Sequence, residues 1–255
     1  MKNNLYDMFF KRKSFHLFRN IGNQCITDAE IKDIEEYIKT ITPLDSDIKI
    51  KIKITKEGVS CHRGQEYCIL FYSEVKDNYL QNIGYIGEQI DLYLVSKNIG
   101  TLWFGIGRVD EKELDNLQYV IMIAMAKVDD VTKFRKDMFK SKRKDIKEIW
   151  DGNNYLDIAN IVRFTPSACN SQPWYVKENN NELTIYRYQK PGKRGIMPKA
   201  MITYYNQIDI GIFLFILELC LDHNNIKYEK TIYTDKIGEN NLYLTAKYAI
   251  INKGR

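Results

Sequence analysis

Three short segments of this chain carry residue types that could bind a planar, anionic ligand. The first is Arg12-Lys13-Ser14, which places two cations and a hydroxyl within three residues. A guanidinium can bind two phosphate oxygens and a hydroxyl can donate a further hydrogen bond, so this tripeptide could bind a phosphate. Taken alone the signal is weak, because an exposed basic tripeptide is more often simply solvated.

The second segment, residues 163–174, reads Arg-Phe-Thr-Pro-Ser-Ala-Cys-Asn-Ser-Gln-Pro-Trp. Its small side chains would let the backbone approach a flat ligand closely, and its two prolines fix the turn. Asn170 and Gln172 could either satisfy backbone groups of the loop or reach hydroxyls of a ligand. For these residues alone, a well-packed loop anchored by Trp174 is the simpler interpretation.

The third segment runs from Gly100 to Gly107 and places glycines beside Trp103 and Phe104. We expect a glycine-punctuated loop here, in which main-chain N–H groups could point at the edge of a ring while an aromatic side chain packs nearby. The segment does not match the glycine patterns of dinucleotide-binding or P-loop proteins. By itself it is typical of an ordinary turn.

Together, and in this order, the segments resemble the FMN-dependent nitroreductase family. The family opens with Arg-Arg-Ser, close to Arg12-Lys13-Ser14, and its loop Pro-Ser-x-x-Asn-x-Gln-Pro-Trp is matched at every specified residue from Pro166 to Trp174. The family's Gly-x-Gly-x-x-Trp-x-Gly segment is matched over residues 98–105, except that Asn98 replaces the first glycine. The resemblance spans nearly the whole chain.

One departure from the family pattern concerns which half carries which segment. In ordinary members both the Arg-Arg-Ser segment and the Pro-Ser loop lie in one half-sized unit, and two identical subunits share each flavin. Here the first half has the basic tripeptide and only the second has the loop. The chain therefore resembles single-chain nitroreductases in which a fused pair replaces the homodimer, which implies one FMN per chain, lying between the halves, and a monomer that acts as a pseudo-dimer.

The same resemblance implies roles for the matched residues. Arg12 and Ser14 would bind the FMN phosphate, and Lys142 and Arg143 would add further phosphate contacts. A solvated linker is an equally good interpretation of that second basic run. Residues 1–145 would form the first half, with the phosphate and N5-side contacts, and 146–255 the second, as one compact unit.

Further flavin contacts are implied around the ring. Lys13 or Arg63 would lie near the N1–C2=O edge, where positive charge favours the anionic reduced ring. A main-chain N–H between Phe104 and Gly107 would face N5. The remaining expected cofactor contacts are Trp103, Phe104, Gly105, Pro166, Ser167, Ala168, Asn170 and Gln172.

The chemistry implied is a ping-pong transfer of hydride from NADH or NADPH through the flavin to a nitroaromatic, quinone or similar acceptor. It needs no metal and no dedicated catalytic side chain, because the flavin does the chemistry. Two alternatives stay open: a flavin-binding carrier or sensor without turnover, and a basic interaction protein that uses the stretch from Lys133 to Lys147.

The composition of the chain bears on nucleic-acid binding, membrane association and cellular location. The chain has 255 residues, 44% of them hydrophobic, and a formal charge of +5 made largely of scattered lysines, which does not favour nucleic-acid binding. The apolar stretch Ile208–Leu221 is interrupted by Asp209 and Glu218, so we expect a buried core helix and no membrane segment. Five cysteines without a CxxC pair favour reduced thiols and a cytoplasmic location.

Hydrophobic periodicity predicts the elements that must position these segments. A capping box predicts a helix starting at Thr27, and alternating isoleucines predict a strand over 48–54. Further helices are expected at Asn4–Lys13, Asn82–Lys97, Asp110–Leu117, Tyr155–Val162 and Met201–His223. Further strands are expected at Tyr67–Ser73, Tyr119–Ala126, Trp174–Lys177, Leu183–Tyr188, Lys227–Tyr233 and Leu242–Ile251. This order favours an α+β fold with a mixed sheet flanked by helices.

Two pairs of similar short segments suggest that the halves are diverged repeats. Thr42-Pro43 and Thr165-Pro166 each follow an isoleucine-rich helix, and Gln89-Ile90-Asp91-Leu92 and Gln207-Ile208-Asp209-Ile210 each lie in a long helix. The offsets, 166 − 43 = 123 and 207 − 89 = 118, are similar. Either match alone could arise by chance, but both occur in the same order on the same kinds of element.

Overall fold

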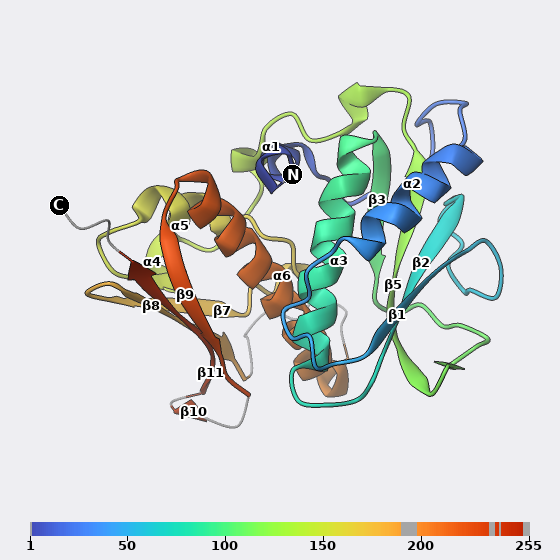
Figure 1. Ribbon diagram of the computed structural model, residues 1–255. Coiled ribbons are helices and arrows are strands. Elements are labelled where there is room, and N and C mark those ends of the chain that lie inside the picture. Colours follow the sequence, from blue (N-terminus) through green and yellow to red (C-terminus); the bar gives the residue numbers. More distant parts are fainter. Residues whose placement is uncertain (1, 190–197, 235–237, 240, 252–255) are drawn as a thin grey trace. The chain divides into compact units, whose positions relative to one another are not determined.

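The structure, a computed structural model, describes residues 2–189, 198–234, 238–239 and 241–251 (Figure 1). The chain divides into two compact units, Met1–Met138 and Phe139–Arg255. Each unit contains its own sheet and its own long, buried helix, and each is described separately below. The α+β class expected from the sequence is confirmed.

The first unit has three α-helices, α1 (Lys2–Lys11), α2 (Asp28–Lys39) and α3 (Tyr79–Ser96), and a 3-10 turn, η1 (Val131–Lys133). The expected capping box of α2 is confirmed: the Thr27 hydroxyl accepts from the Glu30 N–H at 3.2 Å, and the Glu30 carboxylate accepts from the Thr27 N–H at 3.0 Å. Helix α3 is buried along almost its whole length, so polar residues on it are enclosed by protein.

The sheet of the first unit is antiparallel throughout, in the order β1-β2-β5-β3. Its strands are β1 (Ile50–Thr55), β2 (Tyr67–Ser73), β3 (Ile99–Phe104), β4 (Glu113–Leu114) and β5 (Leu117–Lys127). Figure 1 shows α3 running alongside β3 of this sheet. Strand β5 pairs with β2, β3 and β4, which explains why it is long and almost entirely buried.

Two expectations in this unit are wrong. The glycine-punctuated loop is largely strand β3: Gly100 pairs with Ala126, and a Cβ at Gly100 would lie 2.9 Å from both Phe15 and Val128. Glycine is therefore there for close packing and not for a turn. The helix expected over Asp110–Leu117 is a hairpin between β4 and β5, because Asp115 and Asn116 have φ of 53° and 63°, as a two-residue turn requires.

The second unit begins near the 3-10 turn η2 (Met138–Lys140) and contains helices α4 (Ile146–Ile149), α5 (Leu156–Val162) and α6 (Ile202–His223), with short turns η3 (Ala168–Asn170) and η4 (Lys199–Met201). Helix α6 is apolar enough to span a membrane by length and composition, but most of it is buried within the protein, as expected of a core helix. Its Phe213 ring stacks on Trp174 at 5.0 Å between centroids.

The sheet of the second unit has the order β10-β11-β8-β7-β6, with β9 also paired to β11. Its strands are β6 (Trp150–Asp151), β7 (Trp174–Asn179), β8 (Glu182–Tyr188), β9 (Lys227–Ile232), β10 (Gly238–Glu239) and β11 (Leu242–Ile251). Only the β6–β7 pair is parallel among the described strands, so this sheet is mixed, as expected, whereas that of the first unit is not.

The two units share one order of elements and one pattern of strand pairing. In each, two strands, a long helix, a strand, a two-residue strand and a last long strand follow one another, and the sheets pair as β1-β2-β5-β3 and β7-β8-β11-β9. The last strand carries a one-residue bulge against the second strand in both units, at Val120 in β5 and at Thr245 in β11.

Candidate functional site

Asp91 on α3 is the centre of a buried polar cluster in the first unit. One carboxylate oxygen accepts hydrogen bonds from Arg12 Nε at 2.9 Å and from Trp103 Nε1 at 3.0 Å, and the other accepts from the Thr101 hydroxyl at 2.5 Å. Asp91 is fully buried and Arg12 is 3% exposed. This carboxylate therefore ties the residue after α1 and the strand β3 to the long helix.

Arg12 itself is held firmly but is not fully hydrogen-bonded. Its Nη1 donates to the Ser14 hydroxyl at 3.3 Å, while its buried Nη2 has no partner in the described part of the chain. Burial by itself would lower the pKa of Arg12, but the charges of Asp91 and Glu88 and the hydrogen bond to Asp91 outweigh it and raise the pKa. Arg12 is thus a fixed cation with one unused donor nitrogen.

A second guanidinium, that of Arg135, belongs to the same environment and was missed in the sequence. Its backbone N–H donates to the Lys11 carbonyl at 3.0 Å, but its half-buried side chain has no hydrogen-bond partner among the described residues. Burial and the nearby charge of Arg12 lower the pKa of Arg135 to about 10, against a smaller opposing effect of Glu88. Two neighbouring cations with unused donors make a favourable position for an anion.

Glu88 completes the cluster. It lies one helical turn before Asp91 on α3 and is fully buried, and neither carboxylate oxygen has a hydrogen-bond partner in the described residues. Burial, followed by the charge of Asp91, raises the pKa of Glu88 to about 8, although Arg12 and Arg135 favour the charged form. A buried carboxyl group without partners is costly in its charged form, so Glu88 is mostly protonated at neutral pH.

The residues expected at the N1–C2=O edge have other contacts in the first unit. The Lys13 ammonium donates to the Lys133 carbonyl at 2.9 Å, and the Arg63 guanidinium lies over the Phe104 ring at 5.6 Å. The N–H of Gly107 donates to the Phe104 carbonyl at 3.1 Å, closing a turn through Gly105. This N–H, one of those expected to face N5, is therefore already hydrogen-bonded.

Gly87 on α3 allows the Trp103 indole to lie against the helix, since a Cβ at position 87 would come within 2.3 Å of that ring. Gly87→Ala is expected to displace the ring, weaken its bond to Asp91 and lower the free energy of unfolding by about 1–3 kcal/mol, despite the better helix propensity of alanine. Urea unfolding measures this change. In a Trp103→Phe background the same substitution should cost less, and an equal cost there would show that the ring is not the obstacle.

In the second unit, Asp209 on α6 holds the Pro-Ser loop. One of its oxygens accepts from the Ala168 N–H at 2.9 Å and the other lies 3.3 Å from the Ser171 hydroxyl, which is also 3.0 Å from the Asn206 side-chain oxygen. Burial raises the pKa of Asp209 to about 8, although the bonds from Ala168 and Ser171 favour its charged form. The loop backbone is thus fixed by a buried carboxyl group.

The loop is also hydrogen-bonded within itself. The Gln172 N–H donates to the Ser167 hydroxyl at 3.0 Å, and the Gln172 side chain donates to the Asn170 carbonyl at 3.3 Å. Cys169, Asn170 and Gln172 have φ of 51°, 55° and 50°, which is unfavourable for residues other than glycine. Such a conformation persists only where its surroundings impose it.

The basic run at 142–144 is one of those surroundings. Arg143 donates to the Asn170 side-chain oxygen at 3.0 Å and to the Phe164 carbonyl at 3.1 Å. Lys144 donates through its backbone to the Gln172 side-chain oxygen at 2.8 Å and through its ammonium to the Gln172 carbonyl at 3.0 Å. The Lys142 carbonyl accepts from the Asn170 amide at 3.1 Å, so this run supports the loop.

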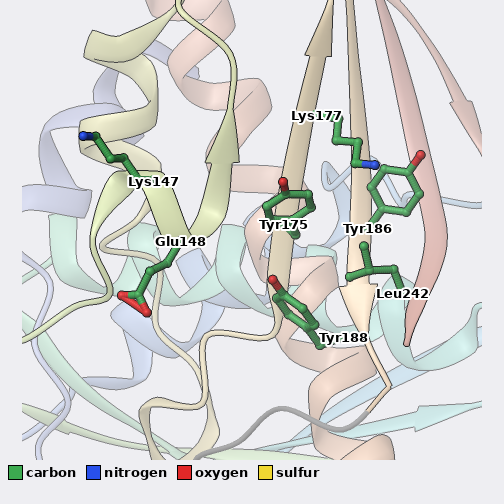
Figure 2. Close-up of a pocket in the computed structure, with 7 residues that line it drawn as sticks. All are labelled: Lys147, Glu148, Tyr175, Lys177, Tyr186, Tyr188 and Leu242. Carbon is green, nitrogen blue, oxygen red and sulfur yellow. The ribbon is translucent and has the colours of Figure 1, made fainter. Parts of the chain in front are cut away.

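The second unit also has a pocket of about 460 Å³ that contains none of the residues expected in the site (Figure 2). The Tyr175 and Tyr188 rings lie 6.1 Å apart, and the Lys177 ammonium lies 5.7 Å from the Tyr186 ring centre. Its rings and amine could hold an aromatic group with a negative charge. The lining residues are Lys147, Glu148, Tyr175, Lys177, Tyr186, Tyr188 and Leu242.

The expected site residues thus form two groups, one in each unit. Arg12, Ser14 and Trp103 meet around Asp91, with Lys13, Arg63, Phe104 and Gly105 in other contacts of the first unit. The second group is the loop that directly follows Pro166 and contains Ser167, Ala168, Asn170 and Gln172. Lys142 and Arg143 are hydrogen-bonded to this loop. Asp91 and Asp209, which organise the groups, were visible in the sequence only as matching acids in two apolar helices.

Comparison with known proteins identifies the family and the fold. A family model described as "Putative TM nitroreductase" matches residues 4–220. The crystal structure of a putative nitroreductase from Thermotoga maritima is 20% identical, covering 97% of this chain and 94% of that one with a TM-score of 0.62, which indicates a shared fold. A nitroreductase family protein from Clostridium novyi NT is 19% identical over 53% of this chain and 90% of its own, with a TM-score of 0.36. No curated protein matches the chain.

Proposed function

Because this chain belongs to the TM nitroreductase family, we propose that it is an FMN-dependent oxidoreductase that passes hydride from NADH or NADPH to a small-molecule acceptor such as a nitroaromatic or a quinone. The observation that carries this proposal is the buried Nη2 of Arg12, which has no hydrogen-bond partner among the described residues, together with the charge of Arg135 acting on the same guanidinium. A buried donor without a partner costs free energy, and a phosphate would satisfy it.

The residues of the first unit would hold the phosphate of FMN. The hydrogen bond to Asp91 fixes the orientation of the Arg12 side chain, and the Ser14 hydroxyl lies within hydrogen-bond distance of the same guanidinium. A phosphate at this position could therefore be bound by a hydroxyl and by a charged donor. Arg135 would be a further phosphate contact in this unit, whereas the guanidinium of Arg143 is engaged by the Pro-Ser loop.

The Pro-Ser loop would supply a rigid, narrow surface for the flavin. Ser167 and Ala168 carry small side chains. The backbone of the loop is held in place by the carboxyl group of Asp209, by the Ser167 hydroxyl and by residues 142–144. A surface fixed before the ligand arrives loses little entropy on binding. When bound, FMN would accept hydride from the pyridine nucleotide and deliver it to the acceptor.

We also propose that the two units arose by duplication and act as a pseudo-dimer within a monomeric, cytoplasmic chain. The shared strand order, the bulge at Val120 and Thr245, and the similar short sequences around Asp91 and Asp209 on the long helices support this.

The test is the absorbance spectrum of the purified protein after reconstitution with FMN. We expect a yellow protein with one flavin per chain that NADH or NADPH bleaches without oxygen and an added quinone or nitroaromatic restores. A yellow protein that neither nucleotide bleaches would be a flavin carrier or sensor. A protein that retains no flavin, but binds polyanions with a steep salt dependence, would favour a basic interaction protein and contradict the proposal.

A further inference from the structure

The fully buried Glu88 has no place in the proposed chemistry, yet neither of its oxygens has a hydrogen-bond partner among the described residues and the charges of both Arg12 and Arg135 act on it. We propose that Glu88 links anion binding to proton binding: the site between Arg12 and Arg135 takes up the phosphate of FMN together with one proton on Glu88. This inference rests on the proposed function only in naming FMN as the source of the phosphate.

The geometry of the cluster supports competition between Glu88 and an anion. Glu88 and Asp91 lie three residues apart and therefore on the same face of α3. The groups that act on Glu88 are Asp91 on its own helix, Arg12 after α1, Arg135 after η1 and the Trp103 indole on β3. Both cations that an incoming phosphate would use are thus also the cations that stabilise a charged Glu88.

Asp91 cannot play this part, because its carboxylate is occupied. It accepts three hydrogen bonds, from Arg12, Trp103 and Thr101, whereas neither oxygen of Glu88 accepts one from a described residue. Both oxygens of Asp91 are thus already hydrogen-bonded, whereas Glu88 is a buried carboxyl group without donors, which takes up a proton readily. Glu88 is therefore the group in the cluster that can change its charge at little cost.

The charges of the cluster give the direction of the effect. With Glu88 protonated, Arg12 and Arg135 outnumber Asp91, leaving one excess positive charge for an anion. With Glu88 ionised, the excess disappears and a bound dianion would meet two fixed carboxylates. The folded protein without ligand has Glu88 at a pKa of about 8, and a bound anion would raise it further. Binding is therefore strongest below pH 8 and weakens as pH rises through that value.

The experiment measures the dissociation constant of FMN for the whole protein between pH 7 and pH 9, from the quenching of flavin fluorescence. The phosphate of FMN stays dianionic over this range, since its second pKa is about 6. We expect FMN to bind about tenfold more weakly at pH 9 than at pH 7, because Glu88 has a pKa of about 8 before binding and a higher one after it.

Two controls isolate Glu88. Glu88→Gln should remove most of this pH dependence and bind FMN more tightly than the wild type at pH 9. Riboflavin, which has no phosphate, should bind the wild type with little pH dependence. A slope in Glu88→Gln equal to that of the wild type would overturn the inference, even though FMN binds. Failure of FMN to bind at any pH would instead contradict the proposed function.

A second measurement does not depend on the variant's folding. Calorimetry of FMN binding to the wild type at pH 8.5, in two buffers of different ionisation enthalpy, counts the protons taken up. We expect between half and one proton per FMN bound, because most Glu88 is ionised before binding at that pH. Uptake of no protons would overturn the linkage directly.

Discussion

Asp91→Ala is expected to lower the free energy of unfolding by about 3–5 kcal/mol. The substitution leaves the guanidinium of Arg12, which is 3% exposed, without its counter-ion, and it removes the acceptor of the Thr101 hydroxyl and the Trp103 indole. A buried charge that loses its partner costs far more than the pair contributes when intact. Urea unfolding followed by circular dichroism and tryptophan fluorescence measures the change.

Asp33→Ala is the matched control for this prediction. Asp33 also pairs with a cation of the first unit, Lys97, at 3.3 Å, but their side chains are 61% and 37% exposed. Exposed ion pairs contribute about 0–1 kcal/mol, so this variant should unfold almost as the wild type does. If the two substitutions cost the same, burial of the Arg12–Asp91 pair would not be the reason for its importance.

Asp209→Ala is expected to release the Pro-Ser loop and to cost about 1–3 kcal/mol, chiefly because the Ala168 N–H loses its acceptor. The backbone around Cys169, Asn170 and Gln172 is strained, so it should relax once this bond is gone. Hydrogen exchange at residues 167–172 should speed up. If the proposed function is right, the same variant should also bind FMN more weakly. Unchanged protection of the Ala168 N–H from hydrogen exchange would contradict the role of Asp209 in holding the loop.

The raised pKa of Asp209 also predicts how the stability of the protein depends on pH. Its pKa in the folded protein, about 8, is raised from an ordinary value near 3.8, so the folded state binds a proton that the unfolded state has already lost. Its contribution to stability is complete below about pH 4 and is lost as the pH rises toward 8. Asp209→Asn, which keeps an acceptor oxygen, should flatten this decline, while the exposed Asp157→Asn should leave it as in the wild type.

Much of this architecture could be predicted from the sequence because burial leaves a periodic trace. The alternating isoleucines of β1, the capping box at Thr27 and the apolar run of α6 each predicted their element correctly. A prediction from the sequence was wrong where one residue type is compatible with two different structures. Gly100 suggested a turn, but glycine also permits close packing between strands, and only the neighbours Phe15 and Val128 distinguish the two cases.

The candidate site was harder to predict than the fold. Its outer residues, such as Arg12 and Asn170, belong to contiguous motifs, so they could be named in advance. The residues that organise them could not, because Asp91, Arg135 and Asp209 meet their partners through long-range contacts that have no local spacing. The sequence also left open whether Asn170 and Gln172 face the loop or a ligand, and their observed bonds within the second unit favour the loop.

Asp91 and Asp209 lie in similar short sequences on the two long helices, yet one holds a guanidinium and the other holds a backbone amide. In an assembly of identical subunits every substitution appears twice, so a change that helps one copy of a residue and harms the other cannot be kept. A single polypeptide carries the two acids at independent positions. Each can therefore be altered alone, which makes this chain suited to measuring what each half contributes without disturbing the other.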